Sequence, residues 1–106
     1  NAMVCMNAVV MDGAVIGEES IVAACSFVKA SFSCEPRSLV VGSPAKVIRQ
    51  LSEKEIAWKS AGTREYQQLA KRSRTSMLRC EPLSEIESDR PSLPTLEVKP
   101  LYQTER

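Results

Sequence analysis

A period of six residues runs through the first third of the chain and constrains its fold more than any other feature. Divided into sixes from Val4, residues 4–33 read VCMNAV, VMDGAV, IGEESI, VAACSF and VKASFS. The fifth place is small and the sixth is apolar in four of these five units. An α-helix repeats every 3.6 residues or so and a half-buried strand alternates, so neither explains this period. The first place is always aliphatic, and its residues are Val4, Val10, Ile16, Val22 and Val28.

This pattern predicts a left-handed parallel β-helix, in which three units close one triangular coil. Each unit would make one short strand and one corner, with the aliphatic first residue inside the prism and the small fifth residue beneath the corner. Successive coils would stack about 4.8 Å apart through parallel-sheet hydrogen bonds. Gly13 and Gly17 ease tight backbone geometry near the corners, and Asn7 and Asp12 suit turns.

After the repeats, residues 34–38 (CEPRS) are expected to break the period as a loop, before a further strand at residues 39–41. A first helix should begin at Ser52, where Glu55 completes a capping box and Leu51 can pack on Ile56. Glycine commonly ends helices in a left-handed conformation, so Gly62 is expected to stop this one. Thr63 would then cap a second helix with an apolar stripe.

Four prolines after Cys80 predict an extended tail rather than a packed element. The expected fold is therefore mainly β, a left-handed parallel β-helix stub followed by two C-terminal α-helices and a tail. Residues 1–2 look like a scar of tag removal, since Met3 follows them. The expected organisation after residues 1–2 is a β-helix end over 3–50, helices over 51–79 and the tail over 80–106.

Composition excludes several kinds of partner and site. A net charge of +1 gives no electrostatic reason to expect nucleic acid or an anionic membrane, and no apolar run is long enough for a membrane span. The four cysteines follow no C-x-x-C spacing, so reduced thiols in a cytoplasmic protein are expected. The chain contains no histidine.

Three segments resemble the C-terminal half of the γ-carbonic-anhydrase-like hexapeptide-repeat family. They are MNAVVMDGAVIGEESIVAA, VVGSPAKVIRQLSEKEIAW and GTREYQQLAKR, and the likeness covers roughly residues 4–87. Within the family it is strongest to a branch linked to phenylacetic acid degradation, with carnitine-operon proteins as near relatives. The GSPAK turn is typical of hexapeptide proteins in general, including acyltransferases, whereas the tryptophan-containing helix and GTREYQ discriminate better.

The resemblance implies trimers that hold Zn²⁺ through three histidines from two adjacent subunits and activate a metal-bound water. Those histidines lie on coils before the MNAVV segment, and this chain has none, so no metal, cofactor or catalytic role is assigned to its residues. Asn7 and Tyr66 correspond to positions near the cleft between subunits in the intact family. A corner turn also explains Asn7, and an apolar helix stripe also explains Tyr66.

Three functions remain open from the sequence. The chain can be the inactive C-terminal oligomerisation and capping part of a trimeric zinc-dependent hydratase or hydrolase, of carbonic-anhydrase or thioesterase type. It can be a fragment of a hexapeptide acyltransferase that uses a coenzyme A thioester, or a purely structural assembly module. In each case a short stack of coils leaves an exposed edge, so a homo-oligomer, and in the family a trimer, is expected.

Overall fold

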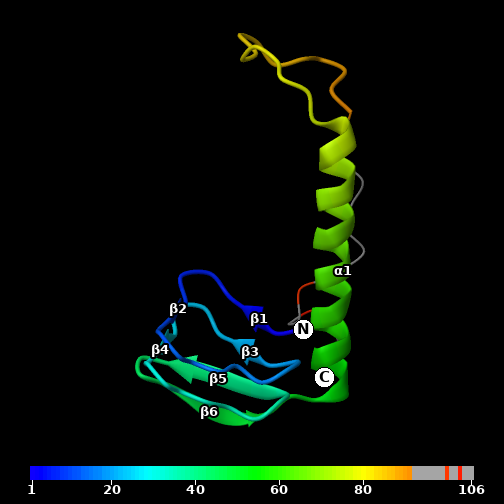
Figure 1. Ribbon diagram of the computed structural model, residues 1–106. Helices are drawn as coiled ribbons and strands as arrows, with labels where there is room; N and C mark the ends of the chain where they lie inside the picture. Colours follow the sequence, from blue (N-terminus) through cyan, green and yellow to red (C-terminus); the bar gives the residue numbers. More distant parts are fainter. Residues whose placement is uncertain (92–99, 101–102, 104–106) are drawn as a thin grey trace. The chain divides into compact units, whose positions relative to one another are not determined.

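The computed structural model describes residues 1–91, 100 and 103 (Figure 1). The chain divides into two compact units, Asn1–Ser60 and Ala61–Arg106, and each is described by itself. The first unit holds the strands and the beginning of the helix, which continues into the second. The elements are β1 (Met3–Val4), β2 (Val9–Val10), β3 (Ile21–Val22), β4 (Phe27–Val28), β5 (Ser38–Gly42), β6 (Ala45–Gln50) and α1 (Glu53–Ser76).

Parallel strand pairing has a constant offset of 18 residues. β1 pairs with β3 through Met3 and Ile21, and β2 pairs with β4 through Val9 and Phe27. β3 pairs with β5 through Ile21 and Leu39 in the same offset. Three hexapeptides therefore make one coil, which confirms the repeat as the unit of the fold; the handedness of the coil stays a prediction.

Every hexapeptide turns its corner at the fourth place, where the backbone has a positive φ. In the first corner the amide of Ala8 donates to the carbonyl of Cys5 at 3.2 Å, around Asn7. A bond from the fourth turn residue to the first, with φ positive at the third, is the pattern of a type II turn. The turn prediction for Asn7 is confirmed. The corner residues are Asn7, Gly13, Glu19, Cys25, Ser31 and Arg37, with φ between 56° and 69°.

The prediction that residues 34–38 break the period is wrong. Cys34 occupies the first place and is buried, and Ser38 occupies the fifth place and is fully buried. Arg37 makes the corner with φ 64°, preceded by Pro36. Proline fits the second residue of such a turn because its φ is already fixed near the required value. A cysteine in an aliphatic place and a proline in a corner therefore continue the sixth hexapeptide.

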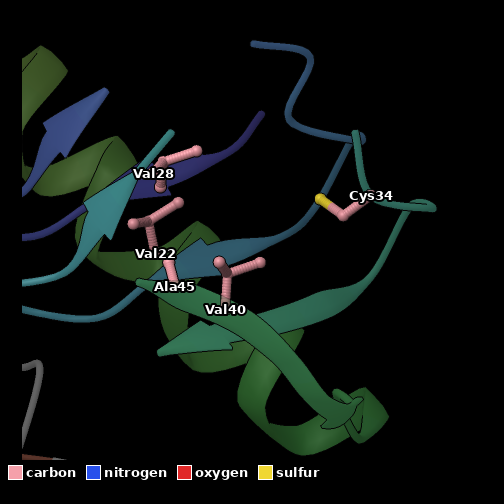
Figure 2. Close-up of a cluster of buried hydrophobic side chains, with 5 residues drawn as sticks. All are labelled: Val22, Val28, Cys34, Val40 and Ala45. Atoms are coloured by element: carbon pink, nitrogen blue, oxygen red, sulfur yellow. The ribbon is translucent and has the colours of Figure 1, made fainter. Parts of the chain in front are cut away.

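The core lies inside the second coil (Figure 2). It consists of four first-place residues, of which Val40 lies on β5, and of Ala45 at the start of β6, so the interior assigned to the first place is confirmed there. A second buried cluster joins Ile21 to Leu51 and Ile56 at the beginning of α1. The residues of the first cluster are Val22, Val28, Cys34, Val40 and Ala45.

An antiparallel hairpin follows the last coil. β5 continues the parallel stack from β3, and β6 returns beside it, so the order in the larger sheet is β1-β3-β5-β6. Between the two strands the chain turns at Gly42, Ser43 and Pro44, with φ 107° at Gly42. Ala45 at the start of β6 is buried against the second coil. The hairpin thus covers the downstream side of the stack.

In the described part of the chain, one helix rather than the predicted two follows the strands. α1 runs through Gly62 without interruption for 24 residues. Among the described glycines a positive φ occurs at Gly13 and Gly42, so Gly62 does not adopt the left-handed conformation that ends a helix. A glycine inside a helix costs only about 1 kcal/mol relative to alanine, which is too little to stop it here.

The predicted capping box begins α1. The Ser52 hydroxyl accepts the Glu55 amide at 3.3 Å, and the Ser52 amide donates to the Glu55 carboxylate at 2.9 Å. Leu51 and Ile56 are buried in one cluster, as a staple across the first turn requires. No helix among the described residues is both long and apolar enough to cross a membrane.

The described residues 77–91 form neither helix nor strand and are exposed, as expected for an extended segment. The rest of the predicted tail, including Pro94, lies outside the described residues except at positions 100 and 103. The domain boundaries predicted from the sequence stay predictions.

Candidate functional site

The first coil presents a free β-edge on the side away from the second coil. The amides of Met3 and Cys5 donate to the carbonyls of Ser20 and Val22, each at 2.9 Å. Successive residues of a parallel strand direct their hydrogen-bonding groups to opposite edges. The N–H and C=O of Val4, between the two donors, therefore face away from the second coil.

The same alternation occurs on the next side of the prism. The amides of Val9 and Met11 donate to the second coil at 2.9 and 3.0 Å, so the backbone groups of Val10 point to the free edge. On the third side the Val15 amide donates to Phe32 at 2.8 Å, which leaves Ile16 in the corresponding position. We call the surface formed by Val4, Val10 and Ile16 the first-coil edge.

Apolar side chains of the first-coil edge are incompletely buried. Val4 is 52% exposed and Val10 is 41% exposed, whereas Val22 and Val40, which have the same place in later hexapeptides, are 0% exposed. Ile16 is half-buried. Exposed backbone groups next to exposed aliphatic side chains are what an additional parallel strand binds. The site can therefore extend the β-stack, and assembly is the chemistry for which it is equipped.

Serines at the fifth place connect the coils through their hydroxyl groups. The Ser38 amide donates to the Ser20 hydroxyl at 3.0 Å, and the Gly42 amide donates to the Ser26 hydroxyl at 3.2 Å. Ser20 and Ser26 are fully buried. Ala8 and Ala14 hold the same place in the first coil, so a small residue at the fifth place does not by itself reveal these hydrogen bonds.

An ion-pair cluster joins two corners to the beginning of α1. Arg37 Nε lies 3.0 Å from a Glu19 carboxylate oxygen, and its Nη1 lies 2.8 Å from one of Glu53. The hydrogen bond to Glu53 and then that to Glu19 raise the pKa of the Arg37 guanidinium. Glu19 thus makes a structural contact between successive coils.

A second ion pair fixes the helix cap. Arg49 Nη2 lies 2.7 Å from Glu55 Oε1. The hydrogen bond from Arg49, followed by that from the Ser52 amide, lowers the pKa of the Glu55 carboxyl to about 2. The Arg49 guanidinium thus holds the capping carboxylate between β6 and α1.

The two residues singled out for the cleft between subunits are both accessible. Asn7 is an exposed corner residue in the first unit. Tyr66 lies on α1 in the second unit and is 76% exposed, so packing within the described part of the chain does not account for it. Their role in lining a cleft stays a prediction.

The residues present do not fit a zinc site. The chain has no histidine, and the described residues contain no group of three or more Cys, Asp and Glu side chains placed to hold a metal. Cys5, Cys25, Cys34 and Cys80 are free thiols. Burial raises the pKa of Cys5, which disfavours the thiolate that would bind zinc.

Comparison with known proteins finds close relatives but no matching family model. The chain is 56% identical over 101 residues to the carnitine operon protein CaiE of Salmonella agona, covering 94% of this chain and 51% of the relative. It is 53% identical over 93 residues to CaiE of Escherichia coli K12, covering 88% of this chain and 47% of the relative. The chain spans about half the length of these curated relatives.

Two solved structures share the fold. A Bacillus cereus protein described as an acetyltransferase superposes with a TM-score of 0.70 at 29% identity, over 72% of this chain and 44% of its own. A hexapeptide transferase family protein from Anaplasma phagocytophilum gives a TM-score of 0.63 at 34% identity, with the same coverages of 72% and 44%. The hexapeptide family named for the second protein agrees with the six-residue period of this chain.

Proposed function

We propose that this chain, a hexapeptide-repeat protein homologous to CaiE, is the C-terminal assembly and capping part of a longer protein and has no catalytic activity of its own. The observation that carries the proposal is the first-coil edge, where Val4 and Val10 are exposed in a place that is fully buried one coil later. Preceding hexapeptides of the same polypeptide would bury these residues and bond to their backbone groups. Homologues about twice as long as this chain supply the room for such coils.

The hairpin supports the second part of the proposal, that this chain caps the stack of coils. β6 pairs with β5 in antiparallel direction, so the parallel stack does not continue beyond it. Ala45 enters the core, while the other residues of β6 are exposed. A strand of this kind ends a solenoid because it covers the last coil and presents no matching place for a further hexapeptide.

We further propose a homotrimer. Support comes from the second unit, where α1 exposes Tyr66 and Leu69 and the segment after it exposes Met77 and Leu78. Large apolar side chains gathered on one short segment are typical of surfaces that bind another protein. One structural relative is a hexapeptide transferase family protein. Three copies around one axis is the arrangement proposed for this chain.

For the intact protein the resemblance supports a zinc-dependent hydratase or hydrolase similar to the phenylacetic acid degradation protein PaaY, working in the cytoplasm. In that protein the metal ligands would all come from coils before this chain, since no residue here fits the metal. Zinc bound there would supply an activated water. Within the intact trimer, Asn7 and Tyr66 would line the cleft beside the metal.

A second candidate is acyl transfer from a coenzyme A thioester in the intact protein. The observation that favours it is the likeness to a protein described as an acetyltransferase and to a hexapeptide transferase. The catalytic base that deprotonates the acceptor would again come from the preceding coils, because histidine is absent here. Binding of coenzyme A to the intact protein after complete removal of metal would favour this candidate over the hydratase.

Mass in solution together with metal content tests the proposal. Light scattering on size-exclusion peaks should give the mass of three chains, and metal analysis of the same peak should give no stoichiometric zinc. Val4→Asp should leave the mass of the trimer unchanged if its interface is distinct from the first-coil edge. A metal-free monomer would overturn the homotrimer, and stoichiometric zinc would overturn the assignment of the metal site to preceding coils.

A further inference from the structure

The six-residue register extends to the first residue of the chain. Residues 1–3 read Asn-Ala-Met and fall in the fourth, fifth and sixth places of a hexapeptide that precedes Val4. The order of an asparagine, an alanine and an apolar residue returns six positions later, in residues 7–9. Each residue type suits its place: asparagine tolerates the left-handed corner, alanine is small and methionine is apolar.

The strand pairing at Met3 has the same register as in the rest of the coil stack. Met3 pairs with Ile21, and its amide donates to the Ser20 carbonyl at 2.9 Å. Asn1 precedes Glu19 by the same 18 residues, and Glu19 precedes Arg37 by 18. Asn1 therefore occupies the same corner as Glu19 and Arg37, one coil earlier.

A buried lysine holds this corner. Lys59 is 1% exposed, and its ammonium donates to the Asn1 carbonyl oxygen at 2.6 Å and to Asn1 Oδ1 at 2.8 Å. The side-chain amide of Asn1 donates to the Ser60 hydroxyl at 3.3 Å. None of these contacts uses the terminal amine of Asn1. They are all compatible with a residue bonded before it.

The first turns of α1 match the spacing of the corners. Glu53 contacts the Arg37 corner, and Lys59, six residues on, contacts the Asn1 corner two coils earlier. Six residues of α-helix rise about 9 Å, and two coil spacings are about 9.6 Å. The first turns of α1 therefore run along one column of corners. Glu53 makes the contact at one end of this six-residue stretch, and Lys59 makes the contact at the other end.

We infer that residues 1–3 are the second half of a further hexapeptide of this protein, not a remnant of tag removal, and that Lys59 is a positioning residue that fixes its corner to α1. The inference deepens the proposed function, on which it rests for the identity of the added coil. The hexapeptide that contains Asn1 would be the first segment to pack on the first-coil edge. An aliphatic residue is expected three positions before Asn1, at the first place of that hexapeptide.

Amide hydrogen exchange of the helix start tests the contact. Lys59→Met removes the ammonium, and exchange over residues 56–60 should speed up about tenfold, because hydrogen bonds to charged groups are among the stronger ones. Asn1→Ala should produce a smaller increase, because the ammonium keeps its 2.6 Å contact with the backbone carbonyl of residue 1. The double variant should add little to Lys59→Met, since that change already removes both contacts. Lys54→Met is the matched control, because Lys54 is an exposed lysine of the same helix.

Equal exchange in the Lys59→Met and Lys54→Met proteins would overturn the positioning role. Asn1→Ala keeps the test informative if Lys59→Met does not fold, since it changes only the contact partner. The codons of the gene provide the second test: Asn1 and Ala2 should be encoded in frame, with an aliphatic codon three positions earlier. A gene without these codons would overturn the inference, while a trimeric mass in solution would still support the proposed function.

Discussion

The two sides of the coil stack use the same repeat and differ in what covers them. On the downstream side, β5 and β6 cover the second coil, and Val40 is 0% exposed. On the upstream side, Val4 has the same residue type and the same place in its hexapeptide, yet it is 52% exposed. Burial in this fold is therefore a property of the layer next to a residue and not of the residue's place alone.

This difference teaches how a solenoid end can be recognised. The covered end has a hairpin, buried serines and ion pairs that join coil, strand and helix. The first-coil edge has a complete repeat pattern without the layer that the pattern is built to contact. An end where the hexapeptide pattern continues is expected to bind a further coil. An end where a different element replaces the pattern is a cap.

Aspartate at the same place on each side should give the largest contrast. Val40→Asp places a carboxylate in the core and should lower the free energy of unfolding by about 3 kcal/mol or more, enough to unfold the first unit. Val4→Asp should cost less than about 1 kcal/mol, since its side chain reaches water. Urea unfolding followed by circular dichroism measures both. Equal losses would mean that the first-coil edge is covered in the isolated chain.

Gly17→Ala should be the next largest effect, because it acts between the coils. A Cβ at Gly17 would lie 2.5 Å from the backbone carbonyl carbon of Glu35, so the coils must separate there. Overpacking of this kind should cost about 2–3 kcal/mol. Gly13→Ala, with its nearest contact at 3.7 Å and φ +69°, should cost only about 1 kcal/mol of backbone strain. The reverse order of the two thermal midpoints would refute the stacking contact.

Ser26→Ala should weaken the covered side at its hairpin. Removing the hydroxyl leaves the Gly42 amide without its 3.2 Å acceptor, which should cost about 1–2 kcal/mol. The control is Ala8→Ser, which adds a hydroxyl at the same place on the first coil and should change stability by less than about 0.5 kcal/mol. Thermal unfolding of the two variants measures the contrast. A neutral Ser26→Ala would return this serine to a packing role alone.

Glu55→Gln should lower stability by about 1 kcal/mol at neutral pH through the capping box. The pKa of Glu55 is depressed in the folded chain to about 2 from 4.5, so the carboxylate stabilises the fold above the unfolded pKa. This contribution is lost as the pH falls from about 4.5 towards 2. The difference between the wild-type and Gln proteins should therefore shrink over that range. A difference independent of pH would contradict the ionised cap.

Gly62→Ala, in the second unit, should give the smallest effect. Nothing lies within 4 Å of a Cβ built there, and the residue is inside α1. Alanine should increase the helical stability by about 0.5–1 kcal/mol. Circular dichroism during heating would detect the gain. A loss of helicity would instead favour two helices separated at this glycine.

The sequence predicts the coil because an aliphatic residue recurs at the first place of each hexapeptide. This recurrence reflects packing inside the prism and does not depend on the helix or strand propensity of single residues. Sequence reasoning missed the sixth hexapeptide, since Cys34 and Pro36 look like loop residues until the corner geometry is known. Glu19 and Arg37 adopt positive φ although neither favours it, because stacking imposes the corner. At Gly62 local propensity predicts a helix end, and no longer-range pattern in the sequence opposes it.

The candidate site was predictable in part. An exposed edge followed from the number of repeats, and the structure adds which backbone groups and side chains form it. Lys59 and its contact with Asn1 could not be found from the sequence, because they join residues 58 positions apart. Asn7 and Tyr66 came from resemblance and await the intact protein.

Protection of the first-coil edge against hydrogen exchange is the most direct test that this edge receives a preceding coil. The amides of Val4, Val10 and Ile16 would be measured in this chain and in a chain extended by the residues that precede it in its gene. Strong protection of all three amides is expected only in the extended chain, with residues of the second coil unchanged in both. Equal protection in the two chains would contradict the stacking of a preceding coil on this edge.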